Sequence, residues 1–321
     1  MHDPQAPPDD LEYRNGPGTR VTYRARQRRT DRTAWLGLTL HLPAFLLSFA
    51  VVLAVALALR AWLGVPVWLP TALWAASGIL AFHRPAEGFL ARHLLGLHRP
   101  VPTELARLVP VWREVTARAG VDGNRYELWV EDSDNVNGLA AAGHIVAVSR
   151  RALRDLPTSR LAAVLAHELG HHSSGHAWSD MLSWWYAIPG RLAWRGLALV
   201  RPWLVRTVRG TSVTALSVLV ILSCYLAFAT LKATYGLPLL LLALPCLTAA
   251  VGRRAELRAD VHAARLGFGR PLVRTLHERL AEESALPGTA RRPRFAARLL
   301  SHHPDPRTRL HHLQRYLEGR G

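Results

Sequence analysis

The sequence predicts a mainly α-helical, polytopic membrane protein with about four transmembrane helices and a further α+β domain that holds a small β-sheet. Two pairs of uncharged apolar stretches predict the membrane helices, and the segments outside these pairs have the mixed pattern of a soluble domain. Half of the 321 residues are hydrophobic, yet 40 Lys and Arg against 23 Asp and Glu give a formal net charge of +17. A soluble protein this basic would suggest a nucleic-acid binder, but the long aliphatic stretches favour a membrane protein. The 11 Trp exclude a mainly disordered chain, and two Cys in apolar stretches exclude a disulfide scaffold.

The first apolar pair follows an arginine-rich N-terminal segment. Residues 1–33 are rich in Pro, Gly and Arg and have no apolar period, so we expect a disordered basic arm. Residues 34–82 are predicted to form a transmembrane hairpin from the apolar stretches Trp35–Leu59 and Val67–Phe82. About 20 apolar residues cross a bilayer, so the first stretch is long enough and the second is marginal.

The second pair predicts another hairpin over residues 211–251, from Ser212–Leu231 and Leu237–Val251. Residues 83–210 and 252–321 are then the two parts of one cytoplasmic domain. Arginines crowd before and after each hairpin, whereas the two hairpin loops carry only Arg60 and Lys232. The positive-inside rule therefore predicts a multi-pass protein of the cell membrane, with both termini and the soluble domain in the cytoplasm.

Within the soluble parts, capping residues and hydrophobic periods predict the local elements. Thr103 can cap a helix that runs to Ala119 and ends at Gly120, and Pro157–Thr158 opens another that ends near Gly175. The other expected elements are strands at Tyr126–Glu131 and His144–Ser149, an interfacial segment Met181–Val205, and helical segments at 252–286 and 307–319.

The helix that ends near Gly175 carries the most specific motif, His167-Glu168-Leu169-Gly170-His171. Residues four apart lie on one helix face, so both imidazoles can bind one zinc ion. Glu168 lies beside that face and can take a proton from a water molecule on the metal.

The third ligand decides the class of zinc site. The metzincin spacing would place Gly and His at Ser174 and Ala177, so that class is excluded. A gluzincin-like site takes a Glu from a later helix, and Glu256 is followed by Asp260 at i+4. Glu256 would complete three protein ligands and leave one position open, and Asp260 would accept from the second nitrogen of a ligand His. The alternative for Glu256 is a surface carboxylate paired with a neighbouring arginine.

These motifs together resemble the membrane zinc metalloproteases of the HtpX and CAAX prenyl protease family. The resemblance covers about residues 83–315, through the segments LAAVLAHELGHHSSGH, RRAELRADVHAARLG and SHHPDPRTRL. It implies that His167, His171 and Glu256 bind one zinc ion per chain and that Glu168 is the general base. His303 and Arg309 match the family's residues that stabilise the oxyanion of the tetrahedral intermediate.

The same resemblance implies where a substrate would bind. Asn137 in NGLAAAG is similar to the family's Asn-Ala-Phe-Ala element, which contacts the substrate backbone, although Gly138 and Leu139 replace Ala and Phe. His144–Ser149 would be the strand that pairs with an extended substrate. The expected partners are polypeptides, above all membrane or misfolded proteins, together with the lipid bilayer, and no nucleic acid.

Several alternatives remain open at this point. His172 is expected to face solvent or to lie behind the ligands, and His176 is off the ligand face. A BlaR-like sensor protease, a site-2 intramembrane protease and a catalytically silent membrane scaffold are the rival functions, together with a membrane-tethered nucleic-acid binder. The polar segment HHSSGH disfavours the second, and the absence of nearby thiols disfavours structural zinc.

Overall fold

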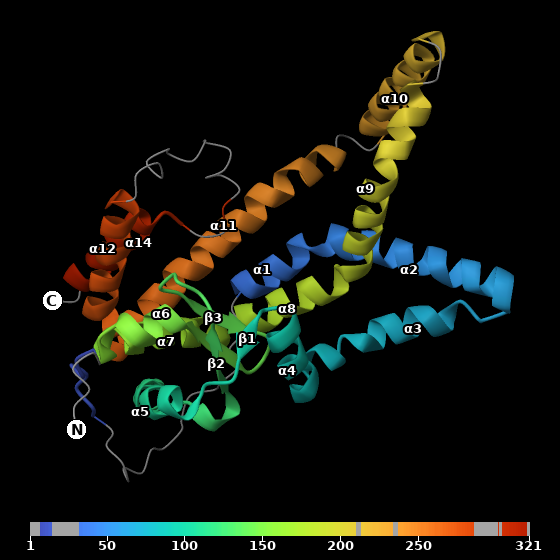
Figure 1. Ribbon diagram of the computed structural model, residues 1–321. Helices are drawn as coiled ribbons and strands as arrows, with labels where there is room; N and C mark the ends of the chain where they lie inside the picture. The colour runs from blue at the N-terminus through green and yellow to red at the C-terminus, as the bar shows by residue number, and fades with distance from the viewer. Residues whose placement is uncertain are drawn as a thin grey trace. The chain divides into compact units, whose positions relative to one another are not determined.

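The computed structural model describes residues 7–14, 32–209, 213–233, 237–285, 301 and 304–319. It is mainly helical with a small mixed sheet, which confirms the predicted combination of secondary structure. Figure 1 shows the helices and strands in chain order. The chain forms two units, and each is described by itself below. Unit 1 comprises Met1–Leu38, Ile79–Leu182 and Ala249–Gly321, and unit 2 comprises Thr39–Gly78 and Ser183–Thr248.

Unit 1 contains a four-stranded sheet of order β1-β2-β4-β3. Strand β2 (Glu127–Glu131) pairs in parallel with β4 (Ile145–Ser149), and β1 (Leu97–His98) and β3 (Gly138–Ala141) add antiparallel edges. The two predicted strands are therefore confirmed to within one residue at each end. The edge strands are too short and too poor in β-branched residues for the sequence to have predicted them.

The position of β4 corrects one prediction about the substrate. Strand β4 has β2 on one side and β3 on the other, so it has no open edge for an extended peptide. Every residue of β4 is buried, because Val146 and Val148 pack on one face and Ile145 and Ala147 on the other. Layers of side chains therefore cover both faces of this strand, as in the interior strands of sheets that are buried on both sides.

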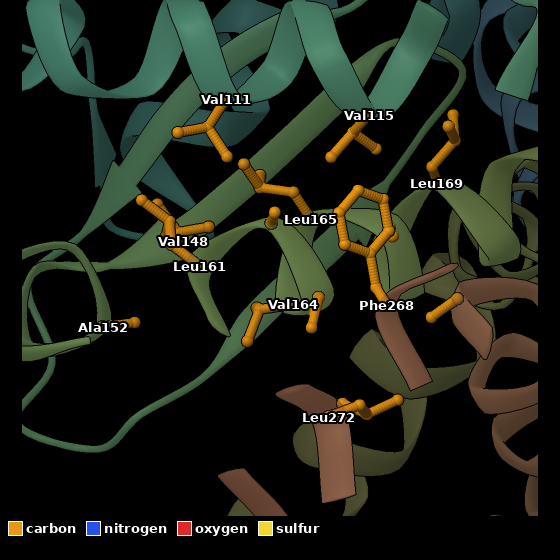
Figure 2. Packing of buried hydrophobic residues seen from close by; sticks show 14 of the residues in the cluster. Val111, Val115, Val148, Ala152, Leu161, Val164, Leu165, Leu169, Phe268 and Leu272 are labelled. Atoms are coloured by element: carbon orange, nitrogen blue, oxygen red, sulfur yellow. The ribbon is translucent and has the colours of Figure 1, made fainter. Parts of the chain in front are cut away.

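The larger core joins one face of the sheet to the helices α5 (Pro102–Ala119) and α7 (Thr158–Ser174). Figure 2 shows aliphatic side chains of both helices meeting Val148 of β4 and Phe268. Helix α5 ends at Gly120 as predicted, where φ is +66°. It starts one residue before Thr103, because the Glu104 carboxylate accepts the Val101 N–H at 2.9 Å.

The C-terminal part of unit 1 departs from the predicted boundary at 251/252. Helix α11 (Leu237–Ala263) is continuous from the apolar stretch into the charged one. The turn η3 (Ala264–Phe268) then follows, in which Gly267 has φ of +91°, and α12 (Gly269–Ala285) begins. The helical segment predicted at 252–286 is therefore divided at Gly267, a backbone conformation that glycine adopts without strain. Helix α14 (Pro306–Glu318) confirms the last predicted helix and packs against α12.

The remaining short elements connect these parts. They are α1 (Arg32–Leu40), η1 (Leu80–Phe82), α4 (Arg84–His93), η2 (Gly123–Arg125), α6 (Arg150–Asp155) and α8 (His176–Tyr186).

Unit 2 consists of the apolar helices α2 (Leu42–Leu63), α3 (Trp68–Ser77), α10 (Val213–Ala233) and the start of α11, together with α9 (Ile188–Arg209), an amphipathic helix that carries five arginines. The first apolar stretch is interrupted at His41, so it is α1 followed by α2 and not one helix from Trp35. Pro43 lies in the first turn of α2, where a missing N–H is tolerated. Helix α9 packs on α2, and the Gly190 N–H donates to Ser48 Oγ at 3.1 Å. Residues 183–209 thus group with the apolar helices, whereas the sequence had assigned them to the cytoplasmic domain.

Only α2 among the described residues is both long and apolar enough to cross a membrane. The segment Trp68–Phe82 is a shorter apolar helix. The third and fourth predicted spans lie in α10 and the first part of α11, and the expectation of four transmembrane helices is not confirmed.

The N-terminal segment also differs in part from the predicted disordered arm. Residues 7–14 contact the start of α7 within unit 1, where the Pro8 carbonyl accepts the Thr158 N–H at 3.2 Å. Asp10 caps the start of α7 by accepting from Ser159 N–H at 2.8 Å, and the Arg14 N–H donates to Glu114. Residues 1–6 and 15–31 of the predicted arm lie outside the described residues.

Candidate metal centre

The centre begins with two imidazoles on α7. The helix is fixed on its inner face by buried aliphatic residues, among them Leu161 and Leu165, and it ends at Gly175 with φ of +84°. His167 and His171 lie one turn apart, with their Nε2 atoms 3.3 Å from each other. Both rings are largely buried, with side-chain exposures of 8% and 16%. The motif therefore directs two nitrogen donors to one point, as the sequence predicted.

Helix α11 brings a carboxylate to the same point. Glu256 Oε2 lies 3.4 Å from His167 Nε2, and Oε1 lies 3.6 Å from His171 Nε2. The three donor atoms lie within 4.8 Å of one another, and they form the metal-binding group found among the described residues. Gly170 makes this approach possible, because a Cβ there would lie 3.0 Å from Ala259 Cα of α11.

Behind these donors lies a buried ion pair. Asp260 is fully buried and accepts from His167 Nδ1 at 2.8 Å, as the sequence predicted. Arg309 of α14 donates to the same carboxylate through Nε at 2.9 Å and Nη2 at 2.6 Å, a two-point contact. Its Nη1 also lies 3.4 Å from Glu256 Oε2. Arg309 therefore contacts both Asp260, which orients His167, and Glu256, one of the three donors, and the sequence did not reveal these contacts.

The pKa values of the two imidazoles are shifted in opposite directions. Burial and Arg309 oppose protonation of His167, but hydrogen bonds to Asp260 and Glu256 outweigh them and raise its pKa to about 9. Burial, together with the neighbouring His167, lowers the pKa of His171 to about 3. Burial would raise the pKa of Asp260, but its bonds to His167 and Arg309 dominate and lower it. The carboxylate of Asp260 therefore lies between two cationic partners, the His167 ring and the Arg309 guanidinium, which favour its ionised form.

Glu168 lies next to the ligands and beneath the edge strand β3. Its residue exposure is 6%, and it is adjacent in sequence to His167. A Cβ on Gly138 would lie 2.5 Å from Glu168 Oε1 and 2.7 Å from its Cγ, so a side chain at this position would require Glu168 to move. The structure therefore shows a close contact between β3 and Glu168, which no signal in the sequence alone would have disclosed.

The other residues singled out from the sequence fall in different places. Asn137 is exposed, and its backbone exchanges hydrogen bonds with Ser149 at 3.0 and 2.9 Å. His172 is not solvent-facing, because its ring is buried and its Nε2 lies 2.7 Å from the Ile145 carbonyl. His176 lies outside the metal-binding group and contacts Thr33 and Ser174. His303 lies outside the described residues.

Residues 102–317 match the family model described as peptidase family M48. This chain belongs to peptidase family M48. The resemblance to HtpX and the CAAX prenyl proteases is thereby confirmed, since these are M48 zinc metallopeptidases that hydrolyse peptide bonds. No curated protein matches the chain significantly.

The donor set of this M48 chain fits the zinc that the family uses. Two imidazole nitrogens and one carboxylate oxygen converge, and His167 Nδ1 is held by a carboxylate, which fixes the ring and raises its basicity. Three protein ligands leave one of the four tetrahedral positions for water or substrate, the arrangement of catalytic zinc sites.

Proposed function

We propose that this M48 chain is a membrane-embedded zinc metalloendopeptidase that hydrolyses membrane or misfolded proteins at the cytoplasmic face. The convergence of His167, His171 and Glu256 from two distant segments is the observation that supports it most strongly. His167 and His171 would hold the zinc through Nε2, and Glu256 would hold it through its carboxylate. The bound zinc would supply a Lewis acid that polarises the scissile carbonyl and acidifies water.

Glu168 is the general base of the proposed reaction. Its carboxylate would accept a proton from the attacking water and donate it to the leaving amine, so that the proton is conserved through the cycle. Contact with Gly138 restricts the side chain on the β3 side, which favours one orientation of the carboxylate.

Asp260 and Arg309 are assigned different roles. Asp260 positions His167 by accepting from Nδ1, which leaves Nε2 available for the metal. The sequence resemblance assigned Arg309, with His303, to the oxyanion. The observed contacts support a positioning role for Arg309, because its guanidinium is engaged by Asp260 and lies close to Glu256.

Strand β3 is the proposed docking edge for an extended substrate. It is the terminal strand of the sheet next to Glu168, whereas β4 is internal. An extended peptide added to such an edge gains main-chain hydrogen bonds that do not depend on its sequence. Asn137 is exposed directly before β3, which supports the proposed contact of its side chain with the peptide backbone.

Membrane insertion and orientation rest on the apolar helices and on the distribution of arginines. Helix α2 supports one span, and the remaining spans and the cytoplasmic orientation are proposed from the sequence. A reporter fused after Gly321 should be active only in the cytoplasm, and activity outside the cell would contradict the orientation.

The decisive experiment is casein cleavage by the detergent-solubilised, zinc-loaded chain and by its Glu168→Gln variant. We expect the variant to retain stoichiometric zinc and to lose at least about 100-fold in kcat, since a general base contributes 10²–10⁴-fold. Glu318→Gln, at an exposed carboxylate near the end of α14, is the matched control and should retain full activity. Proteolysis that survives in Glu168→Gln would remove this residue from the mechanism.

A further inference from the structure

An open cavity of about 730 Å³ lies in unit 1, against the side of α11 that faces away from Glu256. Arg254 and Arg258 of α11 and Arg265 of η3 line it, and Arg32 at the start of α1 completes a set of four guanidinium groups. At 3.6 residues per turn, Arg254 and Arg258 lie on the face of α11 opposite Glu256 and Asp260. The cavity is therefore separate from the metal centre, although one helix serves both.

The charge in this cavity has one sign. No carboxylate is among its lining residues in the described part of the chain. Two of the guanidinium groups are oriented by hydroxyls: Arg258 Nη1 donates to Thr33 Oγ1 at 2.9 Å, and Arg265 Nε donates to the Tyr316 hydroxyl at 3.3 Å. The four arginines are exposed, so water and salt screen their mutual repulsion in part, but together they give the hollow a positive potential that attracts an anion.

We propose that this cavity binds a phosphate group, carried either by an anionic phospholipid or by a soluble phosphate. Guanidinium groups present paired N–H donors that match the geometry of phosphate oxygens. Leu257 and Val261 supply an apolar floor between the arginines, which suits the glycerol and upper acyl part of a lipid. The volume is within the range of small-molecule sites.

Two of the arginines lie close in sequence to apolar helical segments, which favours a lipid headgroup as the carrier of the phosphate. Arg32 stands ten residues before Leu42, the first residue of the candidate span α2. Arg254 stands three residues after Val251, where the apolar part of α11 ends. Gly170 of α7 also lines the cavity, so a bound phosphate would hold α7 and α11 together. A ligand that binds only the folded protein must raise its thermal stability.

The test uses the full chain without any activity measurement, so its outcome is independent of the proposed peptidase function. The variant is Arg254→Gln/Arg265→Gln, and the charge-matched control is Arg270→Gln/Arg274→Gln, at two exposed arginines of α12 outside the cavity. The single variant Arg254→Gln is included in case the double variant folds poorly. One arm adds inorganic phosphate to the protein in detergent, with chloride at equal ionic strength as reference. The other arm compares nanodiscs of phosphatidylcholine with nanodiscs that also contain phosphatidylglycerol.

In at least one arm, the Tm of the wild type and of the control should rise with the phosphate-bearing probe. Each lost guanidinium should weaken affinity about tenfold, so the double variant should bind about 100-fold more weakly. A response to inorganic phosphate identifies a soluble ligand, and a response to phosphatidylglycerol alone identifies a lipid headgroup. The proposal is overturned if neither probe raises the Tm of the wild type, or if both cavity variants respond as strongly as the control.

Discussion

The buried pair of Asp260 and Arg309 makes a prediction whose size can be worked out from the structure. Asp260→Asn keeps the shape of the side chain but removes the charge that meets His167 Nδ1 at 2.8 Å and Arg309 at 2.6 and 2.9 Å. Breaking a buried ion pair by removing one partner costs about 3–5 kcal/mol. Glu256 lies 3.4 Å from Arg309 and still offers it a carboxylate, so we expect a loss of about 3 kcal/mol, at the lower end of this range.

Two measurements on Asp260→Asn separate stability from metal binding. In the chelator-treated protein, Tm should fall by roughly 6–12 °C, since 1 kcal/mol corresponds to about 2–4 °C in a unit of this size. Zinc affinity, measured by competition with a chromogenic chelator, should fall about 10–100-fold because His167 loses the partner that orients it. Asp155→Asn is the control: its partner Arg151 is 3.5 Å away and the pair is exposed, so its effect should stay below about 1 kcal/mol.

Adding Arg309→Gln tests whether the two residues act as a unit. The double variant should lose less stability than the sum of the two single variants, because it leaves no unpaired buried charge. Additive losses, or an Asp260→Asn protein with wild-type zinc affinity and Tm, would refute the positioning role. An Arg309→Gln protein that keeps its zinc affinity but loses kcat would instead support the oxyanion role that the resemblance implied.

Three further predictions concern the surroundings of the ligands. Gly170→Val should lower zinc affinity at least about tenfold by pushing α11 away from α7, measured by the same competition; unchanged affinity would contradict the close approach. Gly138→Val should lower kcat while zinc stays bound, because its branched side chain would displace the Glu168 carboxylate, and single-turnover kinetics with equal zinc content would check this. Zinc binding should displace the proton of His167, whose pKa is raised to about 9, so apparent affinity should rise about tenfold per pH unit up to that pH and then level off. The same raised pKa stabilises the zinc-free protein fully below its unfolded value of about 6.5, and this contribution is lost as the pH rises through about 9.

The sequence predicted those parts of the site whose residues lie close together along one helix. The two imidazoles at i and i+4, and the carboxylates Glu256 and Asp260 at the same spacing, need only a helix to share a face, and both helices are present. The strands β2 and β4 and the end of α7 at Gly175 likewise follow from local patterns. The four predicted spans and the orientation remain predictions beyond α2.

What the sequence could not supply are the contacts between distant segments. Strand β3 has no strong β propensity, and it exists because it pairs with β4, which then becomes internal. The burial of His172 depends on Ile145, and the engagement of Arg309 depends on Asp260, 49 residues earlier in the chain. Contacts of this kind leave no periodic pattern in the sequence, because the two residues belong to different elements and are not a fixed number of residues apart.

The two glycines at the centre show how the fold and the chemistry depend on each other. Gly170 is part of the zinc-binding motif but supplies none of the three donor atoms. Because it has no side chain, α11 approaches α7 closely and Glu256 reaches the imidazoles. Gly138 does the same for the edge strand, which lies against Glu168 because no Cβ intervenes. Glu256 of α11, Glu168 of α7 and the edge strand β3 thus come from three separate segments, and Gly170 and Gly138 lie where these segments approach one another closely. A larger residue at either position should therefore leave the fold intact, with its burial supplied by the core of α5, α7 and the sheet, and impair only the centre.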